Sequence, residues 1–386
     1  MPTSLRETRF TRAAENRAAA IDRRLVEVLA AGRGRHSVRR VVVVVLCGAV
    51  HLVTLAFVAA AVWALWPGTN VEHKVLGVLC LLVAFALRPT FPRATKGAGL
   101  VDPEKAPATH ALVADIAAAI GAPMPTRLEV FSRINATASL TGLRGRTVGF
   151  GAPLWAASSE QARIAVLAHE LGHFANGDPL HGRYVSGALQ TLDHWLSIFT
   201  PVNTSSASLG HGPTLGRRAL MNPGIQRLIF WPVRVVLTGY AHVISLVAAP
   251  DHRRAEALAD LCAARAAGTD GAVDALEVTL ATLGIEVAVN RAAVCREDPA
   301  PALQAFREAF DADRRAGVRR SGAAEKSRMD AEHPLTCDRL RLLESSPRME
   351  AAVTRTPEEW AAIEAEWARP VASRLTALAE SMRYRR

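Results

Sequence analysis

The sequence His-Glu-Leu-Gly-His, from His169 to His173, constrains the fold of this chain more than any other feature. Histidines four positions apart project from one face of an α-helix, with Cβ atoms roughly 6 Å apart, and can hold one metal ion. Glu170 follows the first histidine, where its carboxylate can take a proton from a zinc-activated water molecule. A catalytic zinc ion usually has three protein ligands, so the fold must bring one more residue to this helix.

The residues around the motif predict a helix with defined ends. Ser158 and Gln161 have the spacing of a capping box, with Ser158 as N-cap. Asn176-Gly177 and then Pro179 are typical of a helix end. The apolar stripe between these ends consists of Ile164, Leu167, Leu171 and Phe174. The alternative to a metal site is an ordinary surface histidine pair on an amphipathic helix.

Glu256 and Asp260 are the best candidates to complete the site. They lie one turn apart in an alanine- and leucine-rich stretch that is expected to be helical, and two carboxylates at this spacing repel without a cation nearby. We interpret Glu256 as the third zinc ligand and Asp260 as a partner that orients a ligand histidine. In the alternative, both are solvated charges paired with nearby arginines, namely Arg253, Arg254 or Arg265.

These patterns together resemble the M48 family of zinc metallopeptidases, which includes the membrane-bound heat-shock protease and the CAAX prenyl endopeptidase. The family has His-Glu-x-x-His on one helix and Glu-x-x-Ala-Asp on a later one, which Glu256, Ala259 and Asp260 match. The similarity runs from about Met124 to Leu343. Two further matching elements are His333-Pro334 with Arg339, and Asn135-Ala136, which resembles the start of the substrate-side strand in relatives.

The resemblance implies a gluzincin-type endopeptidase with one zinc ion per chain. The zincin-like fold class would be α+β and helix-rich, with a small antiparallel sheet whose edge holds an extended peptide. The resemblance also implies that His333 helps to stabilise the oxyanion and that Asn135, Ala136 and Arg339 contact substrate. Taken by itself, His333 is a lone histidine, and such residues are more often structural than catalytic.

Short strands are predicted before the zinc helix, at Leu128 to Phe131, Thr137 to Thr141 and Thr147 to Phe150. They follow an amphipathic helix over Ala106 to Ile120, which Gly121 ends. An antiparallel sheet in this place suits a zincin because its edge can pair with a substrate backbone. A purely structural sheet would have the same sequence pattern.

Charge and cysteine content limit the compartment and the partners. The formal net charge is +10, and the first forty residues carry ten arginines against four acids. Because this basic segment precedes an apolar run and contains no nucleic-acid motif, we expect it to contact anionic lipid and not nucleic acid. The five cysteines form no C-x-x-C pair, which fits a reducing compartment for the catalytic part.

Val41 to Trp66 is an almost uninterrupted apolar run that is long enough to span a bilayer. Val75 to Leu87 is a second, shorter run. Basic residues precede the first run and follow the second, so the positive-inside rule predicts a hairpin with both flanks in the cytoplasm. The catalytic domain would then face the cytoplasm from a multi-pass site in the cell membrane. If the second run is instead a buried helix, the catalytic domain lies outside.

A third hydrophobic region, residues 184–249, separates the two metal motifs. Since His169, His173 and Glu256 must meet at one ion, the chain between them crosses a membrane either twice or not at all. Tyr184 to Thr200 carries several polar residues and would span poorly, while Leu228 to Ala249 is strongly apolar. Two crossings and a hairpin embedded in the membrane therefore remain alternatives.

The expected domains are a basic segment (residues 1–40), a transmembrane hairpin (41–88), a peptidase domain (106–345) and a helical C-terminal extension (346–386). Asp311 to Asp330 is expected to be a flexible linker or lid. In the extension, a capping box opens a helix at Thr356, and Pro370 separates it from a final basic helix. This extension could dock on the peptidase domain or contact a partner or membrane surface.

The predicted function is that of a membrane-anchored zinc metalloendopeptidase that acts on peptides or proteins. A catalytically silent membrane scaffold with the same fold is the alternative, and the intact Glu170 argues against it. A membrane-tethered nucleic-acid binder is a further rival. The oligomeric state has no signature in the sequence.

Overall fold

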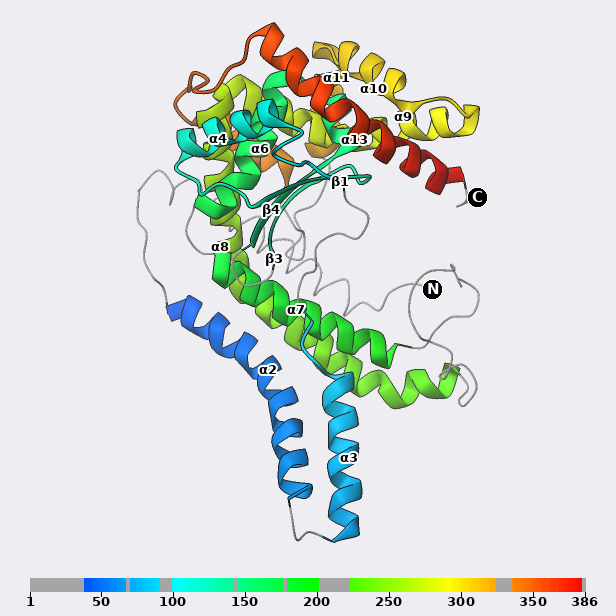
Figure 1. The fold of residues 1–386 in the computed structure, drawn as a ribbon. Coiled ribbons are helices and arrows are strands. Elements are labelled where there is room, and N and C mark those ends of the chain that lie inside the picture. Colours follow the sequence, from blue (N-terminus) through cyan, green and yellow to red (C-terminus); the bar gives the residue numbers. More distant parts are fainter. Residues whose placement is uncertain are drawn as a thin grey trace. The chain divides into compact units, whose positions relative to one another are not determined.

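The computed structural model describes residues 38–66, 70–90, 99–141, 145–175, 179–200, 223–323 and 335–383. The chain divides into two compact units (Figure 1). The first comprises the described residues of Arg93–Pro179 and Pro250–Arg386, and we call it the sheet unit. The second comprises Arg35–Pro92 and Leu180–Ala249, and we call it the helical unit.

The sheet has four strands in the order β1-β2-β4-β3. Their bounds are Gly99–Leu100 (β1), Arg127–Phe131 (β2), Ala136–Thr141 (β3) and Gly145–Gly151 (β4). All three predicted strands are present, but the prediction of an antiparallel sheet was wrong, because β2 and β4 are parallel, with Leu128 opposite Val148. The chain reverses its direction between β2 and β3 and again between β3 and β4, which makes β4 parallel to β2 and places the buried strand β4 between β2 and β3. Among the described residues, β3 is therefore an edge strand.

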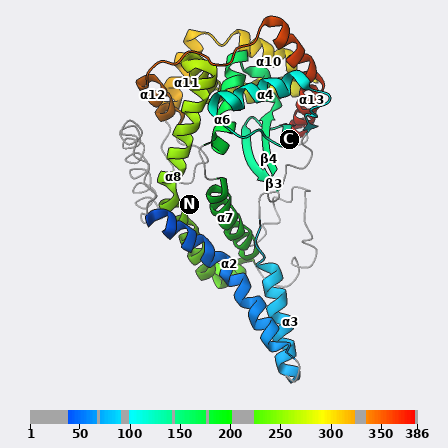
Figure 2. The same cartoon turned by 60° about the vertical axis from the view of Figure 1, so that its left-hand side comes forward.

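Helices α4 (Pro107–Ile120) and α6 (Glu160–Ala175) pack against each other, and α6 also packs on β3 and β4 (Figures 1 and 2). Helix α4 ends at Gly121 as predicted. Gly121 has a φ of 70°, in the left-handed region that favours glycine. The cap of α6 differs from the prediction. Ser159 accepts the Ala162 N–H, whereas Ser158 donates to a carbonyl of the preceding short helix α5 (Ala152–Ala157).

A long helical segment, α8 (Pro223–Leu280), leaves the helical unit and enters the sheet unit at Pro250. Gly268 has φ 78° and ψ 159°, which marks a kink between two helices. Further helices of the sheet unit are α9 (Thr282–Cys295), α10 (Pro299–Glu308), α11 (Ala312–Ala323) and α12 (Thr336–Ser345). The expected linker or lid is thus helical over α11, where Arg315 and Arg319 form ion pairs with the buried Glu277 of α8.

The C-terminal extension forms one helix, α13 (Pro357–Arg383). The predicted capping box is confirmed, since the Thr356 N–H donates to Glu359 and the Glu359 N–H donates to Thr356. Pro370 does not divide the helix as expected, because α13 continues through it. Its residues Trp360, Ile363, Trp367 and Leu375 are buried in the same core as those of α4, α6 and the sheet. Packing on the sheet unit therefore accounts for the buried face of α13.

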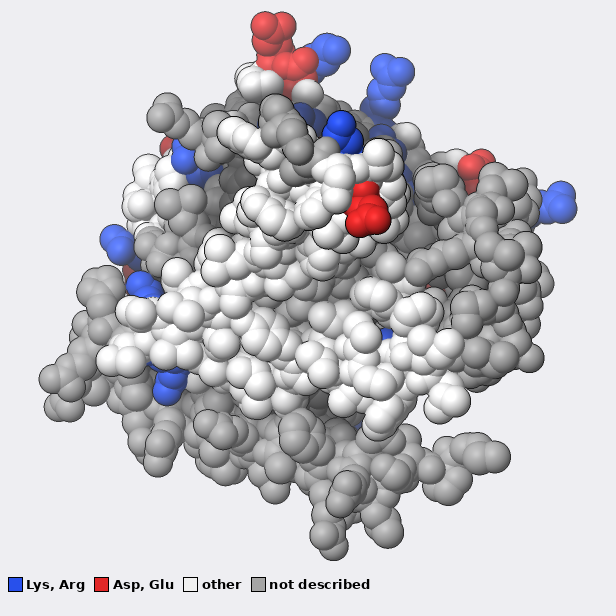
Figure 3. Space-filling view, turned by 90° about the horizontal axis from the view of Figure 1, so that it is seen from below, with Lys and Arg blue, Asp and Glu red and all other residues white. Residues whose placement is uncertain are grey.

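The helical unit contains α2 (Val38–Ala64), α3 (Val71–Ala86), α7 (Pro179–Phe199) and the first part of α8. Within the described part of the chain, two helices are long and apolar enough to cross a membrane, α2 and the part of α8 from Leu228 onward. Helix α3, the expected second span, has 16 residues and packs against α2. Many large apolar side chains of α2, α3 and α8 are exposed, and the described surface in Figure 3 carries few charged residues.

Candidate active site

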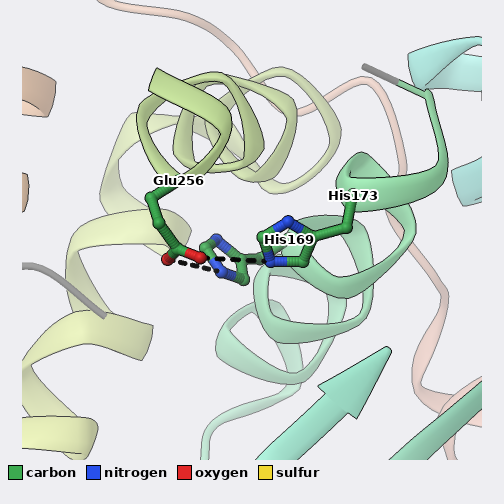
Figure 4. A group of neighbouring side chains, drawn as sticks. All are labelled: His169, His173 and Glu256. Atoms are coloured by element: carbon green, nitrogen blue, oxygen red, sulfur yellow. Dashed lines mark ion pairs between the residues drawn. The ribbon is translucent and has the colours of Figure 1, made fainter. Parts of the chain in front are cut away.

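The structure brings His169 and His173 of α6 together with Glu256 of α8 (Figure 4). One nitrogen or oxygen from each residue lies within 4.8 Å of the others. His169 Nε2 is 3.6 Å from Glu256 Oε2, and His173 Nε2 is 3.6 Å from Glu256 Oε1. The two imidazole rings are nearly perpendicular, with centroids 4.9 Å apart. Three donor atoms therefore surround one point between the two helices.

This donor set fits a zinc ion. In a tetrahedral site with Zn–N and Zn–O bonds of about 2.0–2.1 Å, ligand atoms lie roughly 3.3 Å apart. The separations of 3.6 Å between the histidine nitrogens and the carboxylate oxygens are close to that value. Glu256 is 1% exposed, so its carboxylate lies away from bulk water beside the two imidazoles. Two imidazoles and one carboxylate are a common ligand set of catalytic zinc.

Asp260 lies behind the first histidine, one turn after Glu256 on α8. His169 Nδ1 is 3.0 Å from Asp260 Oδ1, and the Arg339 guanidinium donates to both Asp260 oxygens, at 2.6 and 2.8 Å. Burial alone would raise the pKa of Asp260, but the charge and hydrogen bonds of Arg339, together with His169, lower it to about 2. Arg339 Nη2 also lies 3.2 Å from His169 Nδ1. In the tautomer that donates Nδ1–H to Asp260, the Nε2 lone pair of His169 faces Glu256.

Gly172 allows the two metal-site helices to approach closely. A Cβ atom at this position would lie 3.0 Å from the Cα of Ala259 and 3.1 Å from the Cβ of Cys262. Ala259 is fully buried at the same contact. Small residues at both positions therefore set the distance between α6 and α8, and with it the distance from Glu256 to the histidines.

A cavity of about 70 Å³ opens beside this cluster. His169, Glu170, Asp260 and Arg339 are among its lining residues. Glu170 is 5% exposed, so its carboxylate is largely removed from bulk water. Asn135 and Ala136, which precede and begin β3, line the cavity as well. The edge strand and the general-base candidate thus border one space.

The other predicted site residues have two different outcomes. Arg339, expected to contact substrate, is 9% exposed and its guanidinium binds Asp260, so we interpret it as a partner of that carboxylate. His333, with Pro334, lies outside the described residues.

Sequence reasoning did not identify the spacing role of Gly172 or the far wall of the cavity. The part of the cavity lining that was not identified comes from α8 and includes Ala272, Ala275 and Leu276. Gly172 lies within the recognised motif, but nothing in the sequence marks it as a helix contact. The alanines of α8 resemble any buried helix face, so no sequence signal separates a cavity wall from an ordinary core.

Comparison with known proteins identifies the family. A search of curated proteins finds no match. The model of peptidase family M48 matches residues 103–346, which is more than half of the 386 residues and includes both metal-site helices. That family implies metalloprotease activity, in agreement with the donor set of His169, His173 and Glu256. This chain therefore belongs to peptidase family M48.

Proposed function

We propose that this protein is a membrane-anchored zinc metalloendopeptidase. The observation that carries the proposal is the convergence of His169, His173 and Glu256 beside the cavity that Glu170 lines. In this proposal, the two histidines and Glu256 hold one zinc ion per chain. Peptides or proteins are the substrates.

Glu170 is the proposed general base. When bound, zinc lowers the pKa of a water molecule to about 7 and polarises a carbonyl oxygen. Glu170 then takes the proton from the attacking water and later donates it to the leaving amine nitrogen. The family resemblance alone supports His333 as the residue that stabilises the oxyanion.

Asp260 and Arg339 have a positioning role in this proposal. Asp260 fixes the tautomer and orientation of His169 by accepting its Nδ1–H. Arg339 in turn fixes Asp260 through two hydrogen bonds and keeps its carboxylate ionised. Neither residue needs to touch the substrate for this effect.

The edge of β3 is the proposed binding place for the substrate backbone. Strand β3 has β4 as its described neighbour on one side only, and Asn135 and Ala136 border the cavity. An extended peptide can add to such an edge by main-chain hydrogen bonds. The bond to be cleaved would then lie next to Glu170.

Membrane anchoring is supported by the surface of the helical unit. Large apolar side chains are exposed along α2 and α3, among them Val45, Leu55 and Phe85, at 64%, 59% and 68%. Water disfavours a continuous surface of this kind, whereas lipid does not. We propose a multi-pass protein of the cytoplasmic membrane, with its peptidase domain facing the cytoplasm because basic residues flank both apolar runs.

The test compares the wild-type protein with Glu170→Gln, both purified at full length in mild detergent. Elemental analysis is expected to find about one zinc ion per chain in both. Casein cleavage should fall at least roughly a hundredfold in the variant, because the general base is lost while the ligands remain. Glu160→Gln is the matched control, since Glu160 lies in the first turn of the same helix and is exposed.

Each result of this test has a distinct meaning. Zinc in correctly folded protein without cleavage by the wild type would favour a catalytically silent scaffold. Absence of zinc from folded wild type would overturn the metal site itself. Equal cleavage by wild type and Glu170→Gln would remove Glu170 from the mechanism.

A further inference from the structure

Helix α9 carries an exposed apolar stripe. Its inner face is buried in the sheet unit, and the helix lies beside α10 and α13 (Figure 1). On its outer face, Leu283, Val287 and Val294 are 72%, 59% and 54% exposed. In the described part of the sheet unit, the other exposed large apolar side chains are Leu100 and Met124, which belong to other parts of the chain. The exposed apolar surface of this unit is therefore concentrated on α9.

The stripe has the spacing of a coiled-coil seam. Leu283, Val287, Asn290 and Val294 follow one another at intervals of four, three and four residues, and we call them the seam. This alternation keeps side chains in one line along a helix that pairs with another helix. The two valines occupy heptad position a and Leu283 occupies position d, a combination that favours two-stranded pairs. Asn290, the polar residue of the seam, is half-buried, and two such amides that face each other can exchange hydrogen bonds.

Two exposed charges flank the seam on opposite sides. Glu286 precedes Val287 and occupies position g, and Arg291 follows Asn290 and occupies position e. In a parallel pair of helices, a g residue faces the e residue that lies five positions later on the other helix. Arg291 lies five positions after Glu286, so two parallel copies of α9 bring the carboxylate of each copy to the guanidinium of the other. In an antiparallel pair, the two Glu286 side chains would instead lie on the same side of the seam.

The charges of this surface argue against lipid as the group that covers the stripe. An anionic membrane surface attracts clusters of lysine and arginine. The charged residues from the start of α9 to the start of α10 are all exposed, and they are Glu286, Arg291, Arg296, Glu297 and Asp298. Acids outnumber bases along this segment. A second copy of α9, in contrast, complements both the apolar seam and the two flanking charges.

We propose that α9 binds α9 of a second copy of this chain, as a parallel pair with two-fold symmetry. In this pair, Leu283, Val287 and Val294 lose their contact with water, and Glu286 of each copy pairs with Arg291 of the other. Both copies use the same surface, so the contact closes as a dimer and does not propagate into a filament. The proposal goes beyond the peptidase function and does not depend on it.

The length of the seam predicts how strong the pair is. Helix α9 has 14 residues, which is two heptads. Stable protein interfaces bury about 1,200–2,000 Å² and involve roughly 20–30 residues from each partner, so α9 alone forms a weak contact in solution. Anchoring of both copies in one membrane, as proposed above, gives them the same orientation and raises their effective concentration. Dimer formation is therefore expected to depend on the density of the protein in the membrane.

Cysteine cross-linking of the full-length protein in liposomes tests the pair. In a background with the native cysteines replaced by alanine, Val294→Cys places a thiol in the seam, next to the same thiol of the second copy. We expect an oxidant to produce a covalent dimer, with a yield that falls as added lipid dilutes the protein. The matched control retains Cys295 alone, which is exposed but lies about 100° around the helix from Val294. Its yield should be at least about tenfold lower.

The same method determines the direction of the two helices. In a parallel pair, Leu283→Cys is adjacent to its own copy and cross-links by itself. In an antiparallel pair, Leu283→Cys would cross-link only when it is mixed with Val294→Cys. We expect each variant to cross-link alone, and a requirement for the mixture would overturn the parallel arrangement.

Charge reversal tests the proposed ion pairs. Glu286→Arg, combined with Val294→Cys, places positive charges opposite each other, and we expect the dimer yield to fall at least about tenfold. Adding Arg291→Glu restores opposite charges and should restore the yield. Glu104→Arg makes the same change at an exposed position outside α9 and should leave the yield unchanged. All of these positions are exposed, and thermal unfolding verifies that each variant is folded.

Three results would overturn the proposal. The first is an equal dimer yield from Val294→Cys and from Cys295. The second is a yield that Glu286→Arg does not change, and the third is a loss that Arg291→Glu does not reverse. Casein cleavage by the wild type has no part in these measurements, so failure of the dimer and failure of the proposed peptidase function are separate outcomes.

Discussion

At the scale of single residues, the metal site depends on a chain of contacts from His169 through Asp260 to Arg339. Arg339 donates two hydrogen bonds to the Asp260 carboxylate and restricts its rotation. The Asp260 carboxylate in turn contacts Nδ1 of His169 and restricts the orientation of the imidazole ring. Asp260 is 2% exposed, so its charge is screened little by water. The ring orientation of His169, a proposed zinc ligand, is thus fixed by Asp260 and by Arg339, whose Nη2 also lies 3.2 Å from His169 Nδ1.

We predict that Asp260→Asn weakens zinc binding by about 10–100-fold, because the amide carries no charge and keeps only one acceptor oxygen for both His169 and Arg339. The variant should also unfold more easily, since the buried Arg339 loses its counter-charge. Competition with a chelator measures the zinc affinity. Asp270→Asn is the control on the same helical segment, where the Asp270 side chain is 77% exposed. Unchanged affinity in Asp260→Asn would remove the positioning role.

Gly172→Val is predicted to weaken zinc binding and to destabilise the fold by about 1–3 kcal/mol. The added side chain would collide with the backbone of α8 at Ala259 and push Glu256 away from the histidines. Gly182→Val provides the control, because a Cβ there meets nothing within 4 Å. Chemical unfolding and chelator competition test the two effects separately. Equal zinc affinity and equal stability of Gly172→Val and Gly182→Val would show that the distance between α6 and α8 does not determine zinc binding.

At the scale of elements, α13 is part of the core although it follows the residues that the family model matches. Trp367 stacks on Trp155 with ring centroids 3.7 Å apart, and Arg163 of α6 binds Glu364 at 2.7 Å. Burial lowers the pKa of Arg163, and Glu364 opposes this shift. Arg163 therefore connects α6 to the helix of the C-terminal extension through Glu364 and the ring of Trp360.

Glu366→Ala is predicted to lower the free energy of unfolding by about 1–3 kcal/mol. Glu366 accepts the N–H groups of Ala108 and Thr109, both at 2.8 Å, and so caps α4. Zinc affinity should change little, since α4 carries no ligand. The matched control is Glu380→Ala, at an exposed position of the same helix. A large loss of zinc with no loss of stability would contradict a purely capping role.

At the scale of the whole molecule, the two units have surfaces suited to different surroundings. The sheet unit buries its apolar residues in one core, whereas the helical unit exposes many of them on α2, α3 and α8. A chain with both properties is expected to place one unit in lipid and the other in water.

The proposed topology predicts that the turn between α2 and α3 faces outward and that the sheet unit faces the cytoplasm. Single cysteines at Asn70 and at Glu104, in a background without the native cysteines, test this with a thiol reagent that does not cross membranes. In intact cells, we expect labelling of Asn70→Cys, and of Glu104→Cys only after permeabilisation. The reverse pattern would place the sheet unit outside.

The sequence by itself determined the local features of this protein. The helix over His169 and His173, the end of α4 at Gly121 and the capping box at Thr356 depend on residues a few positions apart, so spacing and caps were sufficient to predict them. The apolar run that forms α2 was recognised for the same reason. The M48 family also followed from the order of short motifs.

The tertiary structure decided which distant groups meet. The sequence predicted that Asp260 contacts a ligand histidine, but the structure shows that this histidine is His169, 91 positions away. No local pattern predicts the contact of Asp260 with Arg339, because these two residues are 79 positions apart. The same holds for the parallel pairing of β2 with β4 and for the alanine-walled cavity. Hydrophobic periodicity and helix caps depend on residues a few positions apart in the sequence. The contacts between distant residues depend instead on the packing of one helix or strand against another, and the free energy of that packing has no local pattern.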